Sequence, residues 1–168
     1  MIHVCSLTRL HRTVIETQAS HVVTLMKDIH MVQRPASIAA ERHLLLDMDD
    51  IPEPLDGYRA PAEEHLVDLL RFVRDWDRAA PLVVHCYAGI SRSTAGAYVT
   101  ACALNPHRDE AGIAQALRRA SPTASPNPRI VSLADDMLGR KGRMVTAIAA
   151  IGRGADAAEA HPFRLDLE

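Results

Sequence analysis

The feature that most limits the fold of this chain is a nine-residue run near its middle, His85-Cys86-Tyr87-Ala88-Gly89-Ile90-Ser91-Arg92-Ser93. Before it lies a short apolar stretch, residues 82–84, which is typical of a buried strand, and after it comes a helical pattern over residues 93–104. Backbone N–H groups at a helix start point toward the preceding loop, and the helix dipole favours an anion there. The run therefore predicts a strand that ends in an anion-binding loop at the start of a helix.

Two side chains of this run would give the loop a chemical function. Five residues separate Cys86 from Arg92, and the hydroxyl residue Ser93 follows the arginine. The field of the helix start should favour the thiolate form of Cys86, which is the nucleophilic form. The planar guanidinium of Arg92 can hold two oxygens of a phosphate at once. We therefore expect a nucleophile facing a bound phosphate group, in a loop that turns tightly at Gly89.

The run resembles the signature of the cysteine-dependent protein tyrosine phosphatases, His-Cys-x-x-Gly-x-x-Arg followed by Ser or Thr, at every defining position. The resemblance is to the dual-specificity-like branch, which includes small bacterial-type tyrosine phosphatases. It implies a phosphate-binding loop made of Cys86, Tyr87, Ala88, Gly89, Ile90, Ser91 and Arg92. It also implies a phosphocysteine intermediate on Cys86, with Ser93 assisting the departing thiolate and His85 bonding the loop and helping to keep the cysteine ionised. No cofactor and no metal are expected.

The family also uses a general acid, an aspartate on a separate loop upstream of the signature. Here Asp47, Asp49 and Asp50 follow a strand candidate within residues 39–48 and begin a proline-bearing loop over residues 47–61. Parallel strands bring such loops to the same edge of a sheet. Asp50-Ile51-Pro52 is most similar to the acid loop of the family, so Asp50 is the first candidate, with Asp49 and then Asp47 as alternatives.

A second resemblance to dual-specificity phosphatases lies downstream, at Ser125-Pro126-Asn127-Pro128. Asparagine followed by proline suits the cap and first turn of a helix, and an apolar helical face begins at Ile130. We expect Asn127 to cap this helix close to the site, and a direct contact with substrate is the alternative.

The rest of the chain alternates between strand and helix patterns. Strands are expected at residues 2–5, 21–26, 44–46 and 82–85, and helices at residues 7–18, 61–76, 93–104, 109–120, 127–139 and 145–151. This alternation predicts an α/β fold with a central, mainly parallel sheet of four to five strands flanked by helices. The resemblance described above implies the phosphotyrosine-phosphatase-like version of this fold. We expect a single catalytic domain over residues 1–152 and a mobile C-terminal tail over residues 153–168.

Composition narrows the possible partners. The 168 residues carry a formal net charge of −2 and no long basic stretch, so nucleic acid is not an expected partner. No apolar run is long enough to span a bilayer, and the N-terminus lacks a signal-peptide pattern. Three scattered cysteines, Cys5, Cys86 and Cys102, indicate a reducing cytoplasm. A reversible disulfide between Cys5 and Cys86 stays open, as does the oligomeric state.

The expected substrate is a phosphorylated protein, or a small phosphomonoester, with phosphotyrosine first. Tyr87 and Ile90 could form an apolar rim for an aryl ring or could equally pack inward. The loop lacks the lysines that family members acting on phosphoinositides tend to carry. A phosphoinositide substrate remains an alternative, as does a phosphate-binding module without turnover. We interpret the basic cluster Arg140, Lys141 and Arg143 as a solvated helix end.

Overall fold

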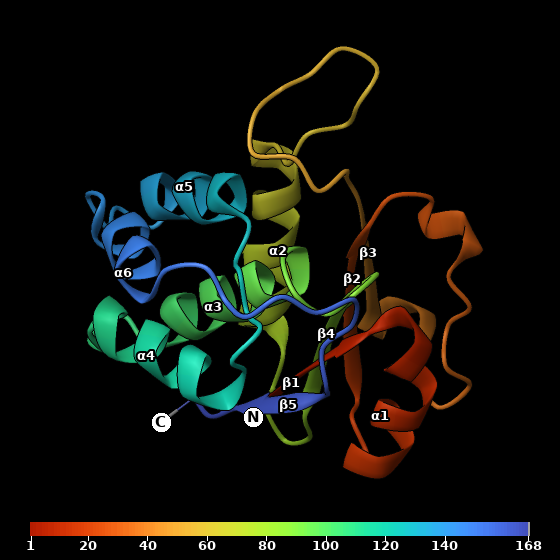
Figure 1. Ribbon diagram of the computed structural model, residues 1–168. Helices are drawn as coiled ribbons and strands as arrows, with labels where there is room; N and C mark the ends of the chain where they lie inside the picture. Colours follow the sequence, from red (N-terminus) through yellow and green to blue (C-terminus); the bar gives the residue numbers. More distant parts are fainter. Residues whose placement is uncertain (168) are drawn as a thin grey trace.

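The computed structural model describes residues 1–167 as a five-stranded sheet with helices on both faces (Figure 1). The strands are β1 (Ile2–Ser6), β2 (His21–Met26), β3 (His43–Asp47), β4 (Leu82–Cys86) and β5 (Phe163–Leu165). Their order across the sheet is β3-β2-β4-β1-β5, and all neighbours are parallel except β5, which runs antiparallel to β1. The predicted α/β fold with a mainly parallel sheet is confirmed.

Within the part of the chain that the structure describes, six α-helices and three short 3-10 helices connect the strands. The α-helices are α1 (Leu10–Thr17), α2 (Glu63–Asp75), α3 (Arg92–Leu104), α4 (Glu110–Ala120), α5 (Pro128–Met137) and α6 (Arg143–Ile151), and the 3-10 helices are η1 (Leu7–Arg9), η2 (Ile29–Met31) and η3 (Ala40–Arg42). In the described residues, 1–167, none of these helices has the length and apolar character to cross a bilayer.

Helix α2 begins two residues later than the expected start at Pro61. The ring of His65, in the first turn, accepts a hydrogen bond from the backbone N–H of Ala62 at 3.1 Å and fixes the start there. At the other end Trp76 stands just beyond the helix, where its indole N–H donates to the carbonyl of Ala80 at 3.0 Å. Both ends of α2 are therefore set by side-chain to backbone bonds that hydrophobic periodicity does not reveal.

The sheet separates a large core from a small one. Apolar side chains of α2 to α6 pack on one face, and α1 covers the other face with a smaller cluster that includes Leu10, Val14 and Ile38. Helix α3 lies closest to the sheet because Gly96 has no side chain; a Cβ there would lie 3.1 Å from Leu25 and 3.2 Å from Val84. This close packing fixes α3, and with it the loop that precedes α3, against the central strands.

The segment expected as a tail contributes to the sheet. Residues 163–165 form β5 beside β1, and Ala160, Leu165 and Leu167 are buried. This strand has only three residues, with Phe163 and Leu165 on either side of Arg164, and so short an alternation is too weak a pattern to predict a strand from sequence. Glu168, the last residue of the expected tail, lies outside the described residues.

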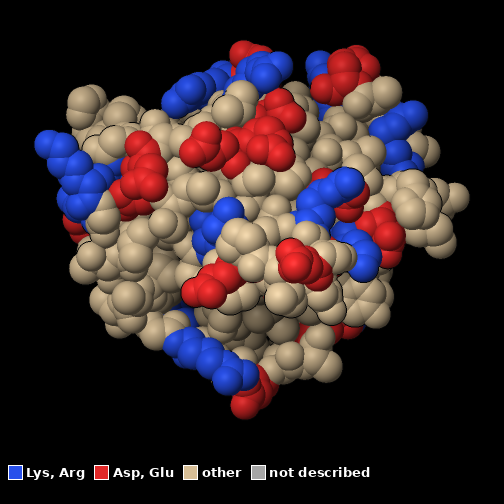
Figure 2. Space-filling model, turned by 90° about the horizontal axis from the view of Figure 1, so that it is seen from above, with Lys and Arg blue, Asp and Glu red and all other residues tan. Residues whose placement is uncertain are grey.

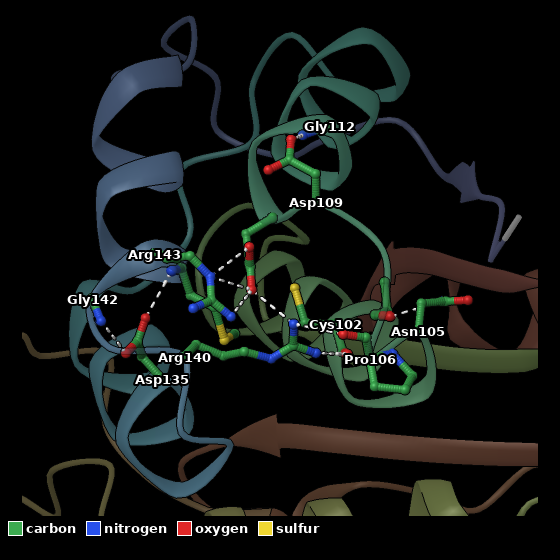
Figure 3. A network of polar contacts seen from close by, with 12 residues as sticks. Cys102, Asn105, Pro106, Asp109, Gly112, Asp135, Arg140, Gly142 and Arg143 are labelled. Carbon is green, nitrogen blue, oxygen red and sulfur yellow. Dashed lines mark hydrogen bonds and ion pairs between the residues drawn. The ribbon is translucent and has the colours of Figure 1, made fainter.

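The basic cluster expected at the surface is partly buried. Figure 3 shows the guanidinium groups of Arg140 and Arg143 close together. Both bond to the carboxylate of Glu110 on α4, Arg140 at 2.7 Å and Arg143 at 3.1 Å. Arg140 also donates to the carbonyl of Cys102 at 2.7 Å, and Asp135 accepts from the backbone of Gly142 and Met144 at the start of α6. The expectation of a solvated helix end is wrong for Arg140, because its guanidinium joins α4 to the end of α3.

Glu110→Ala should destabilise the fold strongly, since it leaves Arg140 buried without its counter-charge. Both side chains of this pair are at most 7% exposed, and removing one partner of a buried pair costs about 3–5 kcal/mol. Arg153→Ala is the control, because Arg153 pairs with Asp156 in solvent and such pairs contribute about 0–1 kcal/mol. Urea unfolding of both variants measures the difference, and equal effects would contradict the prediction.

Candidate active site

Cys86 stands at the carboxyl end of β4, the central strand of the sheet. Its Sγ lies 3.1 Å from the hydroxyl oxygen of Ser93 in the first turn of α3, and both residues are buried. Between them the backbone turns at Gly89, whose φ is +76° and where a Cβ would lie 3.0 Å from the backbone of Cys5 and Ser6. Only glycine fits this turn, because the loop passes there against the backbone at the end of β1.

The backbone carbonyls of the loop are bonded to segments that surround it. The four bonds are Leu7 N to Tyr87 O (3.1 Å), Ala160 N to Ala88 O (2.9 Å), Ser125 N to Ile90 O (2.9 Å) and Asn127 N to Ser91 O (3.3 Å). In a planar trans peptide the C=O and the following N–H point in opposite directions. A carbonyl held toward the surroundings therefore turns the next N–H toward the space that the loop encloses, where an anion can accept it.

Arg92 brings a buried positive charge to this loop. The residue is 9% exposed, and its Nη1 donates to the carbonyl of Met48 at 2.8 Å. Its Nε has no hydrogen-bond partner among residues 1–167 and lies 3.9 Å from a carboxylate oxygen of Asp50. A buried N–H without an acceptor is costly, and an oxyanion in the loop would satisfy it.

The structure separates the three aspartate candidates. Asp50 lies over the loop, where one carboxylate oxygen accepts from Ser91 Oγ and from Asn127 Nδ2, each at 2.8 Å. Asp47 pairs with the guanidinium of Arg59, and Asp49 accepts from the backbone N–H of Arg59 at 2.7 Å. We call the proline-bearing segment, residues 47–61, the acid loop, and residues 86–92 the phosphate loop. Among the described contacts, Asp50 alone of the three candidates joins the acid loop to the phosphate loop.

Asn127 has a larger part in the site than the sequence indicated. Its Oδ1 caps α5 by accepting from the backbone of Arg129 and Ile130, as expected for a residue before proline. Its Nδ2 donates to Asp50 and, at 3.3 Å, to the carbonyl of Ile51. One side chain therefore fixes the start of α5 and the acid loop together. No sequence signal beyond the Asn-Pro pair pointed to this second contact or to that of Ser91.

His85 lies beneath the loop in a chain of hydrogen bonds. Its Nε2 is 2.6 Å from the hydroxyl of Thr24, which is 2.8 Å from His43 Nε2, and its Nδ1 is 3.4 Å from the carbonyl of Cys86. Burial lowers the pKa of His85 to about 4, against the bond to Cys86, which raises it. The imidazole is therefore neutral near pH 7 and orients the backbone of Cys86 without adding positive charge.

The other two cysteines are buried thiols. Burial raises the pKa of Cys5 and of Cys102 to about 12, so both remain protonated near neutral pH. In the β1–β4 register Cys5 lies opposite His85, and Ser6 lies opposite Cys86. Since neighbouring residues of a strand point to opposite faces, Cys5 and Cys86 point to different faces of the sheet. This geometry does not favour a disulfide between them.

The surroundings of the site are partly apolar. Tyr87 is 67% exposed beside the loop, and Leu55 and Tyr58 are exposed on the acid loop. Figure 2 shows the face toward which the acid loop projects, with acidic and basic side chains interspersed over it. Long-range attraction of a highly charged ligand is therefore weak on this face.

The comparisons with known proteins agree with this geometry. Residues 56–122, which include the loop, match the family model described as protein-tyrosine phosphatase. No curated protein sequence matches the chain. The match to this family model supports a cysteine-dependent phosphatase, a hydrolase, and the solved structures below, which include dual-specificity phosphatases, share the predicted fold.

Three solved structures share the fold. The PTP-2 phosphatase of Cydia pomonella is 18% identical, with a TM-score of 0.63 over 80% of this chain and 84% of that one. DUSP15 is 17% identical, with a TM-score of 0.63 over 92% of this chain and 94% of that one. PTPMT1 in complex with PI(5)P is 14% identical, with a TM-score of 0.59 over 89% and 94%.

The burial of His85 predicts that stability falls in mild acid. Its pKa is lowered from 6.5 to about 4 in the folded protein. Between these two pH values the histidine binds a proton in the unfolded chain but not in the folded one, so lowering the pH favours unfolding. The stabilisation is full above about pH 7, and about 2 kcal/mol of it should be lost by pH 5. Urea unfolding at both pH values measures the loss.

His85→Gln is the matched variant, because it keeps a polar side chain that does not titrate. The unfolding free energy of this variant should depend less on pH than that of the wild type, with the remaining slope due to other buried histidines such as His43. Identical slopes for the two proteins would contradict the prediction.

Proposed function

We propose that this chain, whose signature and fold agree with the cysteine-dependent protein tyrosine phosphatase superfamily, hydrolyses phosphotyrosine in proteins through Cys86. One observation carries the proposal: three features meet in the loop. The thiol of Cys86 is buried, the loop carbonyls bond to the segments around the loop, and the Nε of Arg92 has no hydrogen-bond partner among the described residues. These groups surround one space with a nucleophile and several N–H donors. A phosphate monoester needs both at the same centre.

In the first step the Cys86 thiolate attacks phosphorus. An S–P bond forms while the bond between phosphorus and the ester oxygen breaks, and the electron pair leaves with that oxygen. Loop N–H groups and Arg92 hold the three equatorial oxygens as charge spreads over them. Asp50, in its protonated form, gives its proton to the departing oxygen, which lies on the side of the loop covered by the acid loop.

In the second step water displaces the sulfur. Asp50, now a carboxylate, takes a proton from the water as its oxygen bonds to phosphorus, and the S–P bond breaks to release inorganic phosphate. The returning thiolate is 3.1 Å from the hydroxyl of Ser93, which can donate a hydrogen bond to it. Ser93 thereby stabilises Cys86 as a leaving group.

Phosphotyrosine is favoured over other phosphomonoesters by the rim of the site. Tyr87 is an exposed aromatic residue of the loop itself, next in sequence to Cys86, and an aryl group could stack against its ring. Interspersed charges on this face favour a singly phosphorylated side chain over a multiply charged headgroup. The alternative is a phosphoinositide, which is supported by the similarity to PTPMT1 in its complex with PI(5)P. A cytoplasmic location is part of the proposal, because a free nucleophilic thiol requires reducing conditions.

The first test compares the wild type with Cys86→Ser on a phosphotyrosyl peptide and on vesicles that contain a phosphatidylinositol monophosphate, with EDTA present. We expect phosphate release from the peptide, loss of at least about 10³-fold in the variant, and little release from the vesicles. Faster release from the vesicles would favour the alternative substrate. Binding of vanadate by the wild type without turnover of either substrate would indicate a phosphate-binding module.

The general-acid assignment predicts a dependence on the leaving group. Asp50→Ala should lower kcat for phenyl phosphate by about 10²-fold or more and flatten the basic limb of its pH profile. The loss should be smaller for p-nitrophenyl phosphate, whose oxygen leaves readily without a proton. Asp49→Ala, on the same loop but bonded to Arg59, is the control and should retain both rates. Equal losses in the two variants would contradict the role of Asp50.

A further inference from the structure

The chain between α6 and β5, residues 153–162, passes across the region of the phosphate loop before it joins the sheet (Figure 1). We name this segment the C-terminal strap. It bonds to three parts of the molecule that lie far apart in sequence: the end of β1, the phosphate loop, and the connection between α4 and α5. No residue of the strap takes part in the two proposed steps of hydrolysis.

One bond of the strap acts directly on the anion-binding geometry. The backbone N–H of Ala160 donates to the carbonyl of Ala88 at 2.9 Å. That carbonyl shares a peptide plane with the N–H of Gly89, so fixing one direction fixes the other. Since glycine has no Cβ to resist rotation, this peptide is the one in the loop most able to turn over. The strap therefore holds the Gly89 N–H toward the space that the loop encloses.

A carboxylate anchors the strap at this point. Glu159, which precedes Ala160, accepts hydrogen bonds from the hydroxyls of Ser6 and Thr8. Ser6 is buried and lies opposite Cys86 in the β1–β4 register, so the anchor is next to the strand that carries the nucleophile. The two hydroxyls lower the pKa of Glu159, which keeps it ionised and a strong acceptor.

The strap also packs on the segment that holds the other half of the loop. At Gly154 a Cβ would lie 2.5 Å from the backbone of Thr123, and the Gly154 N–H donates to the hydroxyl of Ser125 at 3.0 Å. Ser125 in turn donates its own N–H to the carbonyl of Ile90. The two contacts place the strap against the phosphate loop at Ala88 and against its support at Ser125.

We propose that Glu159 is a positioning residue of the phosphatase, acting through the strap to keep the Gly89 N–H directed at the bound phosphate. The proposal rests on the proposed function, since it concerns the same loop. Without the carboxylate anchor the Ala160 bond loosens, and the Ala88–Gly89 peptide loses its fixed orientation. The bound phosphate and the transition state of phosphoryl transfer then lose the Gly89 N–H as a fixed hydrogen-bond donor. Cys86, Arg92 and Asp50 remain in place.

The test uses the full chain in four forms: wild type, Glu159→Ala, Glu159→Gln and Asp156→Ala. Asp156 is on the same strap but pairs with Arg153 in solvent, so its variant controls for a change of charge there. Removing an oxyanion donor outright costs about 10²–10³-fold, and a loosened donor should cost about 10-fold. We therefore expect Glu159→Ala to weaken vanadate binding and lower kcat by about 10-fold each. Glu159→Gln, which keeps an acceptor oxygen, should recover most of the loss.

Vanadate binding and turnover are both measured, so that the two proposals can fail separately. A wild type that neither binds vanadate nor hydrolyses an aryl phosphate would overturn the proposed function. Wild-type vanadate affinity and kcat in Glu159→Ala would overturn the role of the strap. Urea unfolding shows whether Glu159→Ala is folded. If it is not, Gly154→Ala replaces it, because the added Cβ pushes the start of the strap away from Thr123 and should weaken vanadate binding in the same way. Unchanged vanadate affinity in Gly154→Ala would overturn the proposal.

Discussion

The candidate site depends on one constraint, the outward bonding of the loop carbonyls. A five-residue turn between Cys86 and Arg92 has no internal ladder to fix its peptides, so neighbouring segments must do so. The N-terminus of η1, the connection before α5 and the strap each contribute backbone donors, and β4 and α3 fix the two ends of the loop. The anion site is therefore a property of the whole domain, because the groups that orient it come from both ends of the chain.

A second dependence connects the acid loop to the same centre. Asn127 caps α5, bonds Asp50 and donates its backbone N–H to the loop at Ser91. The carbonyl of Met48, just before the acid loop, accepts from Arg92. The acid, the arginine and the phosphate loop thus share bonds, so a shift in one alters the orientation of the others. In the proposed mechanism Asp50 acts first as an acid and then as a base, and these shared bonds would hold it in place for both steps.

The sequence predicted the parts of the fold that strong local patterns encode. The strand before Cys86, the helix after it and the cap at Asn127 each have a signature within a few residues, and the predicted sheet is confirmed. The strand β5, the burial of Arg140 and the contacts of Asp50 with Ser91 and Asn127 depend on partners from 30 to over 150 residues away. Periodicity and capping rules report on local structure only, so they carry no information on such pairs.

The pairing of β5 with β1 has a consequence for the order in which the molecule assembles. Ile2 lies opposite Leu165, so this pair closes a loop of almost the whole chain, and such contacts form slowly because their entropic cost comes before their gain. The four strands β1 to β4 and the helices over them can pack before β5 joins the sheet. In such a compact chain Cys86 would be in place on β4 before the strap holds its loop. Under the proposed function, the chain would therefore become catalytically active only in the last step of folding.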